Sequence, residues 1–293
     1  MNIKRRNHTV TRGYLANWRG VDENGKTGIW YYDIESKSVM FSLGQKASFA
    51  VRNDIYAPIY IGSDRDDRLE NWLAESESQL CDFSRNFSTS KPRRMKPRAI
   101  KKALQSIVGA SLRSQFSIER TELYFQTQYP SEHSDVIKLR TLNNLYSAAH
   151  RLADAFIGGA AMIVEVDNPT FGTNDQPFWD MSPRTDEPVA IFPLSPTRLL
   201  VLLPNQPISG GDMQFRFVKG DEVPAIVEFG KVGALRMARR WVVCSSEAEA
   251  ESAANYLTDE AIAEAWSTDR ILGYNGEVGR QLFSIDDEYD RDQ

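Results

Sequence analysis

Four side chains in this sequence combine acid–base or metal-binding chemistry with suggestive spacing. His8 lies in a polar, basic stretch, and an imidazole that titrates near neutrality can act as a general acid or base. Glu70 and Glu77 are seven residues apart, which places both carboxylates on one side of a helix. Asp167 follows the predicted strand 160–166 at the point where the chain must turn, and catalytic acids are common at strand ends.

Oxygen ligands of this kind favour Mg²⁺ or Mn²⁺. We therefore expect Glu70, Glu77 and Asp167 to hold such an ion, beside His8. Two cysteines and three histidines are too few for a Cys-rich zinc cluster, so we expect no zinc. Each residue has a structural alternative: a surface or capping histidine, a solvated helix face for the glutamates, and a turn aspartate before Pro169.

Residues 91–102 carry seven Lys and Arg and no acidic residue. A positive charge density of this kind attracts phosphates and releases their counterions. We assign the phosphate contacts to Arg93, Arg94, Lys96, Arg98 and Lys101. One alternative is a solvated loop that leads into a helix. Another is docking on the C-terminal half, since residues 1–150 have a net charge of +7 and residues 151–293 one of −12.

Several classes of protein are excluded or disfavoured. The sequence has no GxxxxGK[ST], GxGxxG or GxSxG motif, so we expect no nucleotide cofactor. Its longest apolar run, residues 155–164, is half of the roughly 20 residues that a spanning helix needs. The first residues lack the apolar stretch of a secretory signal. We therefore expect a cytoplasmic protein without a membrane partner, in which Cys81 and Cys244 are reduced.

The spacing of apolar residues predicts the elements that position these side chains. Two β-rich runs predict a hairpin over residues 28–43. Four helices are expected at residues 66–87, 98–116, 119–128 and 136–157, the last with Leu142 and Tyr146 in its apolar stripe. Strands are expected at residues 160–166, 189–192, 199–203, 213–218 and 241–244, and a rigid turn at residues 193–196. Two further helices are expected at residues 222–237 and 247–267.

A hairpin, a helical block and a mixed region do not alternate as in a doubly wound sheet, so we expect the α+β class. We expect residues 1–283 to form one domain, with the hairpin at 28–43, the helical block at 64–158 and the mixed region at 159–283. The two β regions would share one sheet. The alternative is two domains. The acidic residues 284–293 are expected to be a disordered tail or to lie on a basic surface.

Several of these segments together resemble the bacterial family called domain of unknown function 4238. The opening Asn7-His8-Thr9-Val10, followed by Tyr14-Leu15 and Trp18, resembles that family's N-terminal Asn-His-x-x-Pro motif and the segment after it, although Thr11 replaces the proline. Two later segments also resemble the family: Asp167-Asn168-Pro169 and Phe192-Pro193-Leu194-Ser195-Pro196. The resemblance spans residues 7–245. It implies candidate positions but no reaction, since the family name records no function.

These features predict a nuclease-like phosphodiester hydrolase that acts on RNA or DNA, as a toxin or phage-defence effector. His8 would be the general acid or base, the carboxylates would hold the ion that activates water, and the basic segment would hold the phosphate backbone. The alternative is a non-enzymatic binding or regulatory module. Its polar motif residues would form a buried network, and its charge asymmetry would drive self-association or binding of a protein partner.

Overall fold

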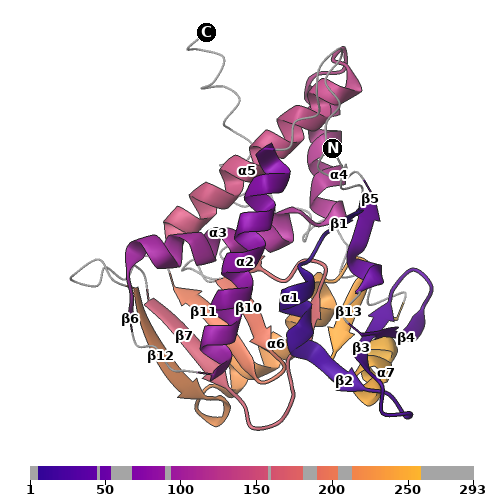
Figure 1. Ribbon diagram of the computed structural model, residues 1–293, viewed down its shortest axis with the longest axis vertical. Helices are drawn as coiled ribbons and strands as arrows, with labels where there is room; N and C mark the ends of the chain where they lie inside the picture. The colour runs from indigo at the N-terminus through magenta and orange to yellow at the C-terminus, as the bar shows by residue number, and fades with distance from the viewer. Residues whose placement is uncertain are drawn as a thin grey trace.

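The computed structural model describes residues 6–44, 47–53, 68–89, 94–157, 160–180, 190–203 and 213–258. Strands come first, then a run of helices, then strands mixed with helices, which confirms the α+β class (Figure 1). The acidic segment 284–293 lies outside the described residues. No helix in the described ranges is both long and apolar enough to cross a membrane.

The N-terminal part holds short strands and a hairpin. Its elements are β1 (Arg6–His8), α1 (Arg12–Leu15), the 3-10 helix η1 (Ala16–Trp18), β2 (Arg19–Val21), β3 (Thr27–Asp33), β4 (Ser38–Leu43), the 3-10 helix η2 (Ser48–Ala50) and β5 (Val51–Asn53). β3 and β4 pair antiparallel, as expected for residues 28–43. β1 pairs with β5 in a separate two-stranded sheet, which places His8 opposite Val51.

Four helices make up the central part: α2 (Arg68–Thr89), α3 (Pro97–Leu112), α4 (Gln115–Gln128) and α5 (Ser134–Phe156). We expected one helix over residues 98–116, and this was wrong at its end. Ser114 caps a new helix there, since its hydroxyl accepts a hydrogen bond from the Ser117 N–H at 3.1 Å. α4 therefore begins at Gln115, earlier than residue 119. In Figure 1, α4 and α5 form a hairpin whose tip lies far from the sheets.

The remaining elements belong mostly to two larger sheets. They are β6 (Arg94–Met95), β7 (Ala160–Glu165), β8 (Thr173–Asn174), β9 (Trp179–Asp180), β10 (Ala190–Ser195), β11 (Arg198–Leu203), β12 (Met213–Lys219), the 3-10 helix η4 (Gly220–Glu222), α6 (Pro224–Met237), β13 (Trp241–Cys244) and α7 (Glu247–Tyr256). The six-stranded sheet has the order β6-β12-β7-β11-β10-β9. The five-stranded sheet has the order β2-β3-β13-β8, with β4 beside β3. The hairpin thus shares a sheet with β13 and β8, while the other C-terminal strands form a second sheet together with β6.

Two of the expected boundaries differ from the structure. α7 ends at Tyr256 and not near residue 267, because Leu257 leaves the helical conformation and is buried with β13 and β3. Residues 259–267 lie outside the described chain. Residues 193–196 do not form a turn as a whole, since β10 continues to Ser195. Its pairing with β11 shifts register between Pro193 and Ser195, which is how the strand accommodates the proline.

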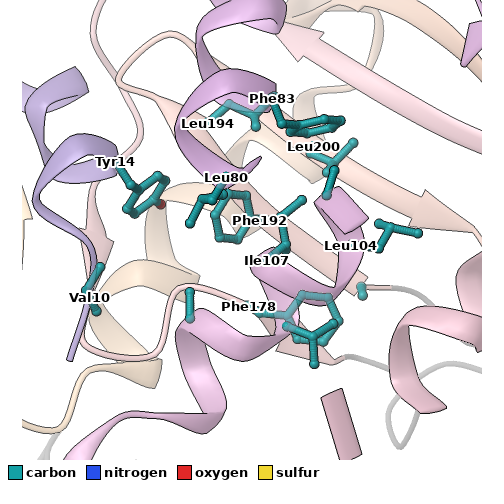
Figure 2. Packing of buried hydrophobic residues seen from close by; sticks show 14 of the residues in the cluster. Val10, Tyr14, Leu80, Phe83, Leu104, Ile107, Phe178, Phe192, Leu194 and Leu200 are labelled. Carbon is teal, nitrogen blue, oxygen red and sulfur yellow. The ribbon is translucent and has the colours of Figure 1, made fainter. Parts of the chain in front are cut away.

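The six-stranded sheet separates two apolar cores. Side chains alternate along β11, so Leu200 points into the core with α2 to α5, and Leu199 and Val201 point into the core with α6. Figure 2 shows the first core, where Phe83 of α2 lies near Leu200. In the same view Tyr14 of α1 points toward Phe192 of β10, with ring centroids 5.0 Å apart. The N-terminal segment is therefore part of this core.

Candidate functional site

The end of α3, the start of α4 and the two residues between them, 111–116 in all, gather polar contacts from distant parts of the chain. The side chain of Arg113 is only 6% exposed. Its Nε donates to the Thr9 carbonyl at 2.8 Å, and its Nη1 donates to the Glu77 carboxylate at 2.8 Å. The Phe178 N–H donates to the Ser111 hydroxyl at 2.6 Å. We call this region the polar junction.

Two of the four predicted catalytic residues lie at the polar junction. His8 is half-buried on β1 and directly precedes Thr9, whose carbonyl binds Arg113. Glu77, on α2, is the ion-pair partner of the same arginine. Arg113 therefore brings the strand of His8 and the predicted metal ligand Glu77 to one place. A carboxylate held by a buried arginine is not the solvated side chain of the structural alternative, and it fits the polar network of the non-enzymatic module.

The other two predicted residues do not join them in the described structure. Asp167 follows β7 and is 90% exposed, with Lys219 Nζ 3.5 Å from its carboxylate. The side chain of Glu70 lies outside the described residues. Within the described ranges, no three His, Cys, Asp or Glu side chains are grouped so that they could hold a metal ion. The metal site therefore stays a prediction from the sequence.

The segments behind the family resemblance meet in the core. The Tyr14 hydroxyl donates to the Pro193 carbonyl at 2.7 Å and lies 2.8 Å from the Thr173 hydroxyl. Asn17 Nδ2 donates to the Leu194 carbonyl at 2.9 Å. The opening segment and the Phe-Pro-Leu-Ser-Pro segment are thus hydrogen-bonded neighbours, 177 or more residues apart in sequence.

Residues 173–179 form a buried polar segment that the sequence did not reveal. All seven are buried, and the segment leads from β8 in one sheet to β9 in the other. Asn174 Nδ2 donates to the Ala234 carbonyl of α6 at 2.7 Å. The composition of the segment resembles an exposed turn, and it has neither strand nor helix periodicity, so only its hydrogen bonds distinguish it.

Asp175 is the single acidic residue of that segment. One carboxylate oxygen accepts the backbone N–H groups of Arg239 at 2.9 Å and Arg240 at 3.2 Å. The other oxygen has no hydrogen-bond partner among the described residues. Burial raises the pKa of Asp175 to about 6, although the two N–H bonds and the charge of Arg239 act in the opposite direction. This buried carboxyl group therefore titrates near neutrality.

Arg239 and Arg240 project from this backbone toward the start of α4. They line a hollow of about 410 Å³ together with Glu35, Gln115, Phe116 and Glu119, and we call it the arginine pocket. The guanidinium carbon of Arg239 lies 4.7 Å above the centre of the Phe116 ring. Arg240 donates to Gln115 Oε1, and its Nη2 lies 3.5 Å from the Glu35 carboxylate. No sequence pattern predicts this pocket, because its members come from three distant segments.

The described part of the predicted phosphate-binding segment, residues 94–102, runs from β6 into the first turns of α3. Lys96 and Arg98 are exposed at the start of α3. Lys101 is bound to Asp154 of α5 at 2.6 Å, which for this residue agrees with docking on the C-terminal half. Lys102 is bound to Glu75 of α2 at 2.7 Å. Two predicted contacts cannot be placed: Arg93 lies outside the described residues, and so does the side chain of Arg94.

Three aromatic rings lie further along the same helices. Trp72 of α2 contacts Tyr146 and His150 of α5, with ring centroids 4.8 and 5.6 Å away. Trp72 lies over Gly109 of α3, where an added Cβ would come within 3.4 Å of the indole. We expected Tyr146 in the core, and this was wrong, because Tyr146 is 39% exposed. Its ring packs edge-on against Trp72 of α2 and is not covered by α5.

We call the outer surface of α2, α3 and α5 the helical strip and define it by Trp72, Lys96, Arg98, Lys101, Lys102, Tyr146 and His150. Lys102 and Gly109 are seven residues apart, so they lie on the same side of α3. The ion pairs of Lys101 and Lys102 therefore lie between the exposed cations and the rings.

Comparison of the chain with protein-family models, with curated proteins and with solved structures gives no match. The resemblance to the family called domain of unknown function 4238 therefore stays a prediction from the sequence.

Proposed function

We propose that this protein binds single-stranded nucleic acid, RNA or DNA, along the helical strip. The observation that carries the proposal is the aromatic cluster of Trp72, Tyr146 and His150 on the same helices as the exposed Lys96 and Arg98. Aromatic side chains stack on bases of any sequence, and cationic side chains hold the phosphates between them. The strip offers both kinds of contact.

The dimensions of the strip suit a short stretch of unpaired nucleotides. Arg98 and Gly109 are eleven residues apart on α3, which corresponds to about 16 Å of helix. Between them, Lys101 and Lys102 are held by Asp154 and Glu75 in partly exposed ion pairs. Such pairs contribute at most about 1 kcal/mol each, so a phosphate can compete for the two ammonium groups.

The contacts of the motif residues favour this binding function over hydrolysis. Glu77 is engaged by the buried Arg113, as in a network that holds the fold together. Hydrolysis is the second candidate, because Arg113 also brings Glu77 beside the strand of His8. Cleavage of labelled RNA or DNA that requires Mg²⁺ or Mn²⁺ and is lost in the His8→Ala variant would favour the hydrolase.

The binding proposal is tested by fluorescence anisotropy with labelled single-stranded RNA and DNA over a series of salt concentrations. The oligonucleotides should have about 16 nucleotides, the upper end of common single-strand site sizes. The Lys96→Glu/Arg98→Glu variant should bind more weakly, and the slope of log affinity against log salt should fall by about 0.7 for each lost phosphate contact. Tyr146→Ala should weaken binding about tenfold or more and leave the slope unchanged, since stacking releases no counterions.

Lys231→Glu supplies the control, because Lys231 is exposed on α6, on the other side of the six-stranded sheet. It should bind almost as the wild type does. Absence of binding by the wild type at low salt would overturn the proposal. So would an equal loss of affinity in the Lys231→Glu and Lys96→Glu/Arg98→Glu variants.

A further inference from the structure

The arginine pocket lies at the start of α4, apart from the residues that define the helical strip. Two cationic side chains, Arg239 and Arg240, line it together with Gln115 and Phe116, the first two residues of α4. A volume of about 410 Å³ is within the range of small-molecule sites. The pocket is therefore large enough for a small ligand, and its lining determines which chemical group it accepts.

Three features of the pocket favour an oxyanion. The guanidinium of Arg239 lies over the Phe116 ring, and a guanidinium keeps its N–H donors in its own plane, in a fork that matches phosphate oxygens. Arg240 adds a second guanidinium from the next residue. The N-terminal end of a 14-residue helix adds the positive end of its dipole, although the Ser117 N–H there is already capped by Ser114.

Asp175 fixes the backbone that carries both arginines. Its buried carboxylate accepts the N–H groups of Arg239 and Arg240 at once, from a segment anchored to the interior. A site whose cations project from a fixed backbone loses less conformational entropy when a ligand binds. Asp175 is thus a positioning residue for the pocket.

Two acidic residues at the pocket oppose an anion. Glu119 accepts a hydrogen bond from Gln115, and Glu35 is exposed with its carboxylate 3.5 Å from Arg240. A phosphate would have to compete with Glu35 for Arg240. The removal of that carboxylate should therefore strengthen anion binding, whereas it should weaken the binding of a cation.

From these contacts we propose that the arginine pocket binds a phosphate group, held by Arg239, Arg240 and the N-terminal end of α4. The phosphate is either the free ion or the terminal group of a phosphate monoester. This site is independent of nucleic-acid binding along the helical strip.

The test is isothermal titration calorimetry of the full chain with inorganic phosphate, at constant ionic strength maintained with sodium chloride. Arg239→Gln should weaken binding at least tenfold, and Glu35→Gln should tighten it several-fold. Lys231→Gln, which removes a positive charge from the exposed side of α6, should leave the affinity unchanged. A parallel titration with a nucleoside monophosphate identifies the source: tighter binding than phosphate assigns the monoester, and equal or weaker binding assigns the free ion.

Thermal melting shows whether the Arg239→Gln variant is folded. If that variant is unfolded, the Glu35→Gln variant, which changes an exposed residue, tests phosphate binding independently. Absence of phosphate binding by the wild type at millimolar concentration would overturn the proposal. Equal affinities of the Arg239→Gln and Lys231→Gln variants, or weaker binding by Glu35→Gln, would do so as well. The anisotropy of labelled oligonucleotides should be the same for Arg239→Gln and the wild type. Each of the two proposed sites can therefore be overturned without the other.

Discussion

Two glutamates of α2 form ion pairs in different surroundings. One pair lies in the polar junction and the other on the helical strip. Glu77 pairs with Arg113 at 2.8 Å, and Glu75, two residues earlier on α2, pairs with Lys102 at 2.7 Å. The distances are almost equal. Arg113, however, is 6% exposed and Lys102 is 46% exposed. Burial and not distance thus separates a contact that holds the fold from one that a ligand can displace.

The largest expected effect is that of a substitution in the buried ion pair between Arg113 and Glu77. Arg113→Leu should lower the free energy of unfolding by about 3 to 5 kcal/mol, because it leaves the Glu77 carboxylate and the Thr9 carbonyl without their donor. Lys102→Leu, the matched change on the helical strip, should cost at most about 1 kcal/mol. Urea denaturation measures both. Similar costs for the two variants would remove the distinction between the two regions.

A second prediction uses the titration of Asp175. Its folded-state pKa is raised from 3.8 to about 6, so its contribution to stability is fully present below pH 4 and is lost as the pH rises through 6. Between pH 4 and pH 7 the wild type should lose about 2 kcal/mol relative to the Asp175→Asn variant. The amide oxygen can still accept the N–H groups of residues 239 and 240. Urea denaturation at several pH values tests this, and parallel stability curves for the two proteins would contradict it.

The smallest effect is expected at the aromatic end of the helical strip. Tyr146→Ala should cost no more than about 1 kcal/mol, since much of the ring is exposed to solvent. Leu142→Ala, one turn earlier on α5, should cost about 2 to 5 kcal/mol, because Leu142 is buried. Thermal melting of both variants checks this. A large loss for Tyr146→Ala would mean that the aromatic cluster is part of the core.

The sequence predicted most elements of the fold because apolar spacing decides them locally. The hairpin, the long helices and the β11 to β13 strands follow this rule. The prediction from apolar spacing failed where a single side chain ends one helix and begins the next. Ser114 ends one helical pattern and begins another, and apolar periodicity cannot detect a cap. The apolar spacing also placed Tyr146 in the core. The spacing shows which side of a helix faces the core, but it does not show where the neighbouring helices stop covering that side.

The candidate sites were less predictable, because their members meet only through tertiary contacts. Nothing in the neighbourhood of Glu77 or His8 in sequence indicates Arg113, which joins their segments from the residues between α3 and α4. Asp175 lies in a segment that resembles a turn, and only its burial changes its chemistry. Lys96 and Arg98 were predictable as exposed cations from charge alone, whereas the rings that accompany them were hidden in the apolar stripes of two helices.

The pairing of β3 with β13 has a consequence for synthesis of the chain. Residues 30–33 of β3 pair with Trp241–Cys244 of β13, so this part of the β3 edge, beyond the residues that pair with β2, has no partner strand until more than 200 further residues have been made. At about 5 to 20 residues per second, that interval lasts about 10 to 40 s on the ribosome. During it, residues 30–33 of β3 present unpaired backbone groups to other chains. The nascent chain is therefore most exposed to aggregation along this edge before β13 emerges.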